Sequence, residues 1–475
     1  MHNVLRPLSI HEASFPIYAQ LGPGAGNIVA CLRVQGALSK ERCEQALRQL
    51  MLKEACLQVA HQCLSKDALS DKKSGYFFVQ LDDALPIFSI SESHGEQFES
   101  NVAVRCHTLL NQPFNDGQLL WRSHLLSDYE NDQHAFFICI NHCISDGASV
   151  TSMLTQWLEK INSEKIEGYS PKELQPLAES LWSSMPSKIA GFLGGIKSLN
   201  MLPAFIKGQK LADKGLNFES GCNVPASEHR CISTFKMLSP KRCEQLVASC
   251  KQLNKSMHGL ISSGLIHQLL LQCQEDNRLE GFTDRFEFPF VSSVDMRSKL
   301  DAVNHGLVGE ETVLGCLSSS VVSMVTVDLD KIGKRYHKAP WQIGDQVTRG
   351  IKSAFKENQH WKVLRFYKVV GLKGLKKMFI DASEKPLATP LSLANLGVVN
   401  FKQRGSEQLS VKGYEVYAAF HASGAGVNVT ANTVNGALTL CFTCSSPAMN
   451  QVSLEHYAEG VVRLLESFEI FDKAP

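Results

Sequence analysis

The stretch "HAFFICINHCISDGASVTSMLTQWLEK", residues 134–160, decides the fold, because it passes from a strand through a turn into a helix. Its first eight residues are mostly apolar, which is typical of a buried strand. Residues 150–161 then repeat apolar side chains every three or four positions, which predicts a helix with one face toward a core. Between these elements Asp146 and Gly147 predict a tight turn, because Asp accepts main-chain N–H groups and Gly tolerates positive φ. His142 stands where the strand ends.

His142 is a candidate general base. A neutral imidazole, with a reference pKa of about 6.5, can accept a proton from a hydroxyl, an amine or a thiol at neutral pH. The alternative interpretation is an ordinary turn with a histidine beside it, since a His-x3-Asp-Gly string arises by chance in about one chain in twenty of this length. The neighbouring Cys143 is a candidate nucleophile, but its apolar neighbours favour a thiol buried in the core.

Composition indicates a globular protein of two or three domains, or of one two-lobed body. The chain has 475 residues, of which 44% are hydrophobic and 20% are charged. With 48 Lys and Arg against 47 Asp and Glu, it has no global field that would recruit nucleic acid. No apolar run reaches the ~18 residues of a membrane span, and the N-terminus lacks the layout of a signal peptide. We therefore expect a cytoplasmic protein.

The fifteen cysteines are scattered, which favours reduced thiols over a disulfide framework. The CxxC pair, Cys441 and Cys444, lies in an apolar run that predicts a strand, where residues three apart face opposite sides. Shared metal ligation by this pair is therefore disfavoured, and we expect no metal site.

Two distant segments of the chain are similar. "LSKERCEQ" at 38–45 and "LSPKRCEQ" at 238–245 match at six of eight positions. Each follows a candidate strand and opens a candidate helix with a serine at the N-cap, Ser39 or Ser239. The unit at 134–160 also has a counterpart, in which the strand "GALTLCFTCS" leads to the helix "SLEHYAEGVVRLLES". Only the first copy carries the histidine and the aspartate.

This duplication predicts an α/β fold of two similar lobes, each a mixed sheet with helices. We place the N-terminal lobe, which carries the histidine motif, at 1–185 and the C-terminal lobe at 225–475, with a crossover at 186–224. Because only one copy keeps the polar groups, we expect a single site in the cleft between the lobes.

The motif and several weaker segments resemble the chloramphenicol acetyltransferase-like acyltransferases, a superfamily that includes the condensation domains of non-ribosomal peptide synthetases. "NHCISDG" at 141–147 is similar to the HHxxxDG signature of this superfamily. The resemblance is closest to the alcohol acetyltransferase and polyketide-associated members. Four other segments follow in the expected order along most of the chain: "GQLLWRSHLL" at 117–126, "KSMHGLISSGL" at 255–265, "SSVDMRSKL" at 292–300 and "LANLG" at 393–397.

The resemblance implies a tunnel between the lobes and an acyl transfer from a thioester to a hydroxyl acceptor, in preference to an amine. His142 would be the general base. Asp146 would pair with Arg297 as a structural residue, and Gly147 would leave room for the substrates. The donor would be acyl-CoA or an acyl group on an acyl carrier protein, and no other cofactor is implied. An activated thioester needs no covalent enzyme intermediate.

Two further polar residues, Ser392 and Asn395, lie on a segment that the superfamily places near the tunnel. They are candidate oxyanion or substrate contacts, and an ordinary strand-end role is the alternative. His258 is expected to fix the start of a helix rather than to transfer a proton.

Three departures from the family pattern leave the substrates open. Asn141 replaces the first signature histidine, the segment at 52–58 lacks its usual histidine and arginine, and the plant-type DFGWG segment is absent. Two alternative functions therefore stay open. One is the condensation of carrier-bound substrates to an amide or ester, and the other is a catalytically inactive binding module of the same fold.

Two segments are candidate contact surfaces. Residues 361–377 hold six basic residues and no acidic one. A helix with a solvated face is the ordinary interpretation, and a coenzyme A phosphate site, a carrier-protein surface or a peripheral membrane contact are the alternatives. The crossover segment at 187–214 is apolar with spaced lysines, which predicts either a packed crossover or a surface that collects a hydrophobic acceptor from lipid.

Overall fold

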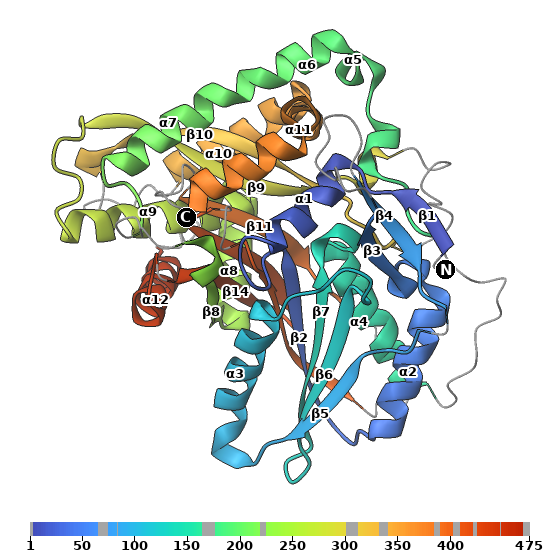
Figure 1. The fold of residues 1–475 in the computed structure, drawn as a ribbon. Coiled ribbons are helices and arrows are strands. Elements are labelled where there is room, and N and C mark those ends of the chain that lie inside the picture. Colours follow the sequence, from blue (N-terminus) through green and yellow to red (C-terminus); the bar gives the residue numbers. More distant parts are fainter. Residues whose placement is uncertain are drawn as a thin grey trace.

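Two large sheets, each covered by helices, form the two lobes of the protein in the computed structural model (Figure 1). A third sheet, of three strands, lies beside the N-terminal lobe and consists of β1 (Asn3–Pro7), β4 (Tyr76–Gln80) and β3 (Val59–Cys63). The structure describes residues 3–64, 75–82, 84–163, 176–218, 225–300, 312–331, 341–383, 390–401, 409–420, 425–446 and 448–468.

The sheet of the N-terminal lobe has five strands in the order β12-β2-β7-β6-β5. Helices cover both of its faces. On one face the Cys139 thiol of β7 donates to the Leu109 carbonyl of α3 (3.4 Å), and on the other Phe136 of β7 stacks on Trp157 of α4. This burial on both sides explains why residues 135–140, just before His142, are all apolar. The bounds are β2 Asn27–Gln35, β5 Phe88–Glu92, β6 Trp121–Asp128, β7 Gln133–Asn141, β12 Ser410–Ala418, α2 Lys40–Lys53, α3 Phe98–Asn111 and α4 Gly147–Asn162.

The sheet of the C-terminal lobe has six strands in the order β10-β9-β11-β13-β14-β8. It is mixed, because β11 runs parallel to β9 and β13 while the other neighbours are antiparallel. The strands are β8 Arg230–Leu238, β9 Arg285–Asp295, β10 Ser318–Asp328, β11 Leu391–Val398, β13 Val427–Val434 and β14 Ala437–Ser446. The helices of this half are α8 Pro240–Gln252, α9 Met257–Glu275, α10 Trp341–Lys356, α11 Gln359–Ser383 and α12 Gln451–Ser467.

The predicted repeat is present, and the structure shows what its shared residues do. Ser39 and Ser239 cap α2 and α8 as predicted, each accepting a main-chain N–H from three residues further on. The arginine of the shared "RCEQ" then donates to main-chain carbonyls at the C-terminal end of a neighbouring helix. Arg42 donates to the Ile161 carbonyl (2.7 Å) at the end of α4, and Arg242 donates to the Leu465 carbonyl (2.9 Å) at the end of α12. Because the last carbonyls of a helix lack partners within it, both arginines satisfy the same need.

The boundary between the lobes differs from the predicted division at 225. Strand β12, which lies far inside the predicted C-terminal lobe, pairs antiparallel with β2 from Ser410 and Gln35 to Ala418 and Ile28. Without it, β2 would leave a long edge of unpaired main-chain groups. The N-terminal lobe is therefore completed by a strand from the C-terminal half, so no single cut of the chain separates the two lobes.

The crossover runs along the outside of the molecule as a row of helices: α5 Ser187–Ala190, α6 Phe192–Ser198 and α7 Leu202–Asp213 (Figure 1, green). Helix α6 packs against α11, which in turn packs against the N-terminal helix α1 (Ile10–Ala19). Within the described residues, no helix is both long enough and apolar enough to span a bilayer.

Candidate active site

His142 begins a short 3-10 turn, η3 (His142–Ile144), directly after β7. Its main-chain N–H donates to the Gly26 carbonyl (2.9 Å), and only 9% of the residue is exposed. Asn141, which replaces the first signature histidine, caps this turn by accepting the Cys143 N–H (3.0 Å). The end of a buried strand and a capped turn therefore fix the backbone that carries the imidazole.

Aromatic rings and a thiol surround the His142 imidazole. Phe15 of α1 stacks on it at a centroid distance of 4.5 Å and an interplanar angle of 3°, and the Phe420 ring lies 5.5 Å away. The Sγ atom of Cys316 lies 3.9 Å from Nδ1. Burial lowers the pKa of His142, although the charge of Asp146 and two main-chain carbonyls oppose this effect. The ring is therefore uncharged at neutral pH.

Asp146 caps α4. Its carboxylate accepts the main-chain N–H and the hydroxyl of Ser149, both at 2.9 Å, and the Leu317 N–H at 3.0 Å. The Arg297 guanidinium completes the set with two bonds of 3.0 Å, one to each carboxylate oxygen. Burial would raise the pKa of Asp146, but the Arg297 charge and these hydrogen bonds lower it below the usual value.

The expected pairing of Asp146 with Arg297 is thus present, and it joins the two lobes. Asp146 belongs to the N-terminal lobe, whereas Arg297 follows β9 of the C-terminal lobe in the turn η8 (Arg297–Lys299). Arg297 also donates to the Ser149 hydroxyl (2.8 Å) and to the Val313 carbonyl (2.9 Å). A buried bidentate ion pair with satisfied neighbours is the arrangement in which such a pair can be stable.

The same network positions Cys316, a residue that the sequence did not single out. The Ser149 hydroxyl accepts the Gly315 N–H (3.1 Å), and Asp146 accepts the Leu317 N–H. Both neighbours of Cys316 are therefore held by the motif. As a result, its thiol lies between two imidazoles, 3.9 Å from Nδ1 of His142 and 3.7 Å from Nδ1 of His11.

His11 is the second residue that the sequence did not reveal. It lies on α1, whose start is fixed by a capping box between Ser9 and Glu12. Its ring lies 6.1 Å from that of Tyr367 on α11. Burial, with a smaller contribution from His142, lowers the pKa of His11 to about 4. No local pattern marked His11 or Cys316, because each approaches His142 only through contacts across the fold.

Gly147 has a different role from the expected one. A Cβ atom at this position would lie 2.7 Å from Cδ2 of Leu396 on β11. The space beside Gly147 is therefore occupied by the Leu396 side chain instead of being left for substrates. A larger residue at position 147 would have to displace the tip of the Leu396 side chain.

Ser392 and Asn395 lie on β11, the strand that reaches Gly147, but both side chains already bond to other residues of the protein. The Ser392 hydroxyl donates to Oδ1 of Asn428 (2.7 Å), and Oδ1 of Asn395 accepts the Gly397 N–H (2.9 Å). Their assignment as oxyanion or substrate contacts stays a prediction.

His258 does not fix its helix as expected. Ser256 caps α9 by accepting the Gly259 N–H (3.0 Å), while the His258 ring bonds to the Ser292 hydroxyl of β9 (2.9 Å). A serine hydroxyl next to the helix start reaches the free N–H groups more directly than an imidazole does. His258 instead ties α9 to the sheet.

The cysteines of the motif and of the CxxC pair are buried. Burial raises the pKa of the Cys143 thiol well above its ordinary value, which suits a core residue and opposes a nucleophile. On β14, Cys441 faces the core of the N-terminal lobe and Cys444 the core of the C-terminal lobe. They lie on opposite sides of the strand, as expected from their spacing.

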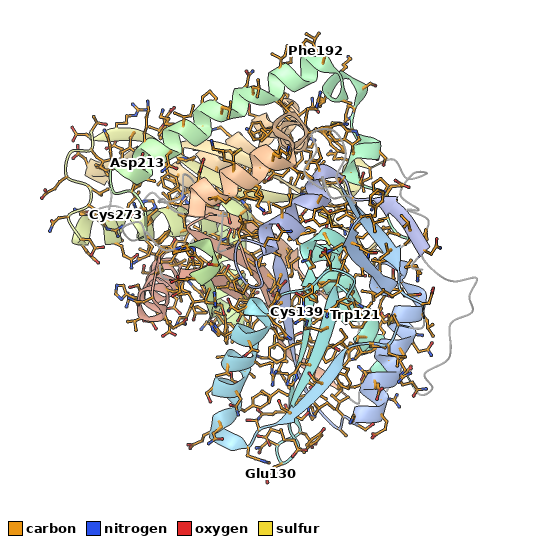
Figure 2. All side chains as sticks on the ribbon, viewed as in Figure 1. Trp121, Glu130, Cys139, Phe192, Asp213 and Cys273 are labelled. Atoms are coloured by element: carbon orange, nitrogen blue, oxygen red, sulfur yellow. The ribbon has the colours of Figure 1, made fainter. Side chains whose placement is uncertain are left out.

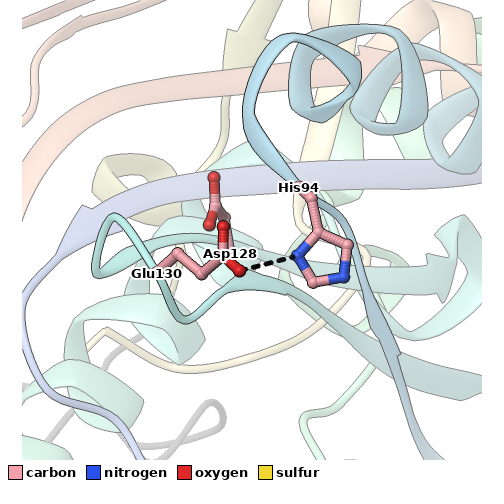
Figure 3. A group of neighbouring side chains, drawn as sticks. All are labelled: His94, Asp128 and Glu130. Carbon is pink, nitrogen blue, oxygen red and sulfur yellow. Dashed lines mark ion pairs between the residues drawn. The ribbon is translucent and has the colours of Figure 1, made fainter.

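One cluster in the described part of the chain has the composition of a metal site. His94, Asp128 and Glu130 bring their ligand atoms within 4.8 Å of one another near the β6–β7 turn (Figure 3). The Asp128 carboxylate, however, already accepts the Gly95 N–H (3.1 Å) and the Asn131 side-chain amide (2.7 Å). These hydrogen bonds of Asp128 account for its position in the turn.

Comparison with known proteins shows a likeness in structure and none in sequence. No family model and no curated protein matches the chain. Among solved structures, the trichothecene 15-O-acetyltransferase TRI3 from Fusarium sporotrichioides has a TM-score of 0.69 and 12% identity, with 98% of this chain and 95% of that chain covered.

Two further structures agree with this likeness. The first condensation domain of the CDA synthetase has a TM-score of 0.64 and 12% identity, with 98% of this chain and 97% of that chain covered. Polyketide synthase associated protein 5 from Mycobacterium tuberculosis has a TM-score of 0.60 and 13% identity, with 98% of each chain covered. The chain therefore has the two-lobed α/β fold that the acetyltransferase and the condensation domains share.

Proposed function

We propose that the protein is an acyltransferase that moves an acyl group from a thioester to a hydroxyl acceptor, with His142 as the general base. The observation that carries this proposal is the buried, uncharged imidazole of His142 at the junction of the lobes, beside an aspartate that pairs with Arg297. The shared fold of an O-acetyltransferase and of condensation domains supports the same class of reaction.

The proposed step needs one proton acceptor and no covalent bond between the enzyme and the acyl group. A ring nitrogen of His142 takes the hydroxyl proton while the oxygen attacks the thioester carbonyl. The tetrahedral intermediate then collapses, the C–S bond breaks, and the imidazolium returns the proton to the leaving thiolate. Because burial lowers the pKa of His142, the ring is available as a base at neutral pH.

Cys316 and His11 support this role by favouring one tautomer of the base, alongside the two main-chain carbonyls that bond to its ring. A neutral imidazole carries one N–H, and the bond made by one nitrogen decides which form the other takes. Burial raises the pKa of the Cys316 thiol, so the thiol stays protonated. It can accept Nδ1–H from His142 and donate S–H to Nδ1 of His11. This order leaves Nε2 of His142 as the proton-accepting atom.

The donor is proposed to be acyl-CoA or an acyl group on an acyl carrier protein, in a tunnel between the lobes. A thioester is activated by its leaving group, so the proposal includes no further cofactor. Ser392 and Asn395 remain the candidate contacts for the developing oxyanion, because β11 reaches the motif at Gly147.

The second candidate is a condensation-type reaction that joins two carrier-bound substrates. The observation in its favour is the fold shared with condensation domains. Asn141 argues against it, because this residue replaces the first signature histidine and serves as a turn cap. A binding module without turnover is the third candidate.

Release of free thiol distinguishes these functions. Purified protein is incubated with acyl-CoA esters of several lengths and with acylated carrier proteins, each with alcohols, amines, water or a carrier-bound acceptor. Release from either donor with free alcohols supports the leading proposal, whereas release that requires both substrates to be bound to carriers supports condensation. No release above background with any pair would favour the binding module. For the variant His142→Ala in this assay, the matched control is His94→Ala, at an exposed histidine outside the site.

A further inference from the structure

The crossover helices α6 and α7 turn large apolar side chains toward solvent. They lie along the outer edge of the molecule, with Phe192 at the periphery (Figure 2). These side chains recur at the spacing of one helical face. The exposed fractions are Phe192 80%, Leu193 68%, Ile196 51%, Leu199 38% and Ile206 55%.

The opposite face of α6 carries small residues, since Gly194, Gly195 and Ser198 are buried. On α7, Gly208 and Leu211 are buried. A Cβ atom on Gly195 would lie 2.9 Å from the Arg365 guanidinium of α11. A surface helix ordinarily buries its large apolar residues and exposes its polar ones. On α6 the large apolar residues are exposed together with Lys197, and an exposed apolar face of this kind marks a contact surface.

Basic residues surround this face. The segments 180–212 and 358–380 contain no Asp or Glu. Val369, 43% exposed, extends the apolar area onto α11 next to Gly195. The exposed lysines on these helices and beside them are Lys188, Lys197, Lys207, Lys210, Lys214, Lys368, Lys373 and Lys377, of which Lys207 pairs with Glu287 of β9. We call the outward faces of α6, α7 and α11 the crossover surface.

The positive charge of the crossover surface favours an anionic partner over a second copy of the chain. A second copy of the chain would place lysines against lysines, which opposes self-association. A surface of protruding apolar side chains with a rim of lysines is typical of helices that lie in the interface of an anionic bilayer. We propose that the crossover surface binds reversibly to an anionic lipid membrane.

This surface lies close to the candidate active site. Helix α11 packs against α6 on one side and against α1 on the other. Its Tyr367 ring is 6.1 Å from that of His11. Helix α11, about 10 Å thick, and His11 of α1 therefore lie between the crossover surface and the Cys316 thiol beside the base. A membrane-bound enzyme would meet a hydrophobic acceptor where that acceptor is dissolved. This consequence rests on the proposed acyl transfer, whereas membrane binding itself does not.

Flotation of the full chain with lipid vesicles tests the proposal. The probes are vesicles of phosphatidylcholine alone and of phosphatidylcholine mixed with phosphatidylglycerol. The wild-type protein should float with the mixed vesicles, and less of it should float as salt screens the lysines. The variant Phe192→Ser/Leu193→Ser/Ile196→Ser should lower the bound fraction about tenfold or more, since each change removes an apolar side chain from the contact.

The matched control changes three exposed apolar residues elsewhere, Leu52→Ser/Val104→Ser/Val452→Ser, and should float like the wild type. Circular dichroism checks that both variants fold. The proposal is overturned if the wild type stays unbound with both vesicles, if the two triple variants float equally, or if light scattering shows a dimer that the first variant dissolves. His142→Ala should float normally, so loss of acyl transfer and loss of docking are separate results.

Discussion

The two copies of the strand–turn–helix unit begin their helices with different N-cap residues. In the first copy, Asp146 caps α4 by accepting the Ser149 N–H at 2.9 Å. In the second, Asn450 caps α12 by accepting the Ser453 N–H at 2.8 Å. A neutral amide is therefore sufficient to cap a helix at this position. The charge of Asp146 must serve something beyond the cap.

The surroundings of the two caps identify that purpose. Asn450 is exposed, whereas Asp146 is buried and pairs with Arg297 from the other lobe. The carboxylate also holds the Leu317 N–H and with it Cys316, beside the imidazole. The shared scaffold repeats in both halves, and the ion pair belongs only to the copy that carries the candidate base.

The largest expected effect comes from breaking the ion pair. Asp146→Ala leaves the Arg297 guanidinium buried without its main partner, which should lower the free energy of unfolding by about 3–5 kcal/mol. Asn450→Ala, the matched change in the second copy, should lower it by about 1 kcal/mol, since only a cap is lost. Urea unfolding measures both. Equal losses would mean that Asp146 is no more than a cap.

The variant Asp146→Asn gives α4 the same kind of amide cap that Asn450 gives α12. Asp146→Asn keeps a cap and removes the charge, so the loss should be smaller than with alanine, about 2–3 kcal/mol. Because the folded protein holds the pKa of Asp146 below its unfolded value, this stabilisation is present above about pH 4 and is lost as the pH falls further. The difference between wild type and variant should therefore shrink in acid. A difference that is constant between pH 7 and 3 would contradict the ion pair.

Removing the shared arginines should affect the two halves alike. Arg42→Ala and Arg242→Ala each free main-chain carbonyls at a helix end, and each should lower the free energy of unfolding by about 1–2 kcal/mol. Arg48→Ala, at an exposed pair with Glu44 on α2, should change it by less than about 0.5 kcal/mol. If only one of the two variants lowered the free energy of unfolding, the two arginines would not have equivalent roles.

The smallest expected effect concerns the thiol beside the base. Cys316→Ala removes the hydrogen-bonding group and should lower kcat about fivefold, which corresponds to ~1 kcal/mol for one hydrogen bond. Cys316→Ser keeps a donor and an acceptor and should retain more of the activity. Thiol release from the acyl donor measures both. Equal rates for the two variants would limit Cys316 to packing.

The sequence predicted what is encoded locally. The end of β7, the start of α4 and the serine caps of α2 and α8 follow from neighbouring residues, and the structure confirms them. The pairing of Asp146 with Arg297 bridges 151 residues and was reached through the family resemblance. A buried carboxylate needs a partner, but only a known pattern could say which one.

What the sequence could not predict depends on contacts between distant segments. Cys316 lies 174 residues from His142 and 305 from His11 in the chain, and none of the three neighbourhoods signals the others. The place of β12 in the N-terminal sheet and the contact of Leu396 with Gly147 have the same character. Each of these contacts forms only when segments that are far apart in the sequence come together in the folded protein.

The pH dependence of kcat/KM for acyl transfer tests the central role of His142 most directly. Because the base must be uncharged and burial lowers its pKa, the rate should stay constant from neutral pH downward and fall only below about pH 6.5. The residual activity of His142→Ala should lack this acidic fall and lie about 10²–10⁴-fold lower at neutral pH. A wild-type rate that already falls above pH 6.5, or a His142→Ala variant with full activity, would contradict the assignment.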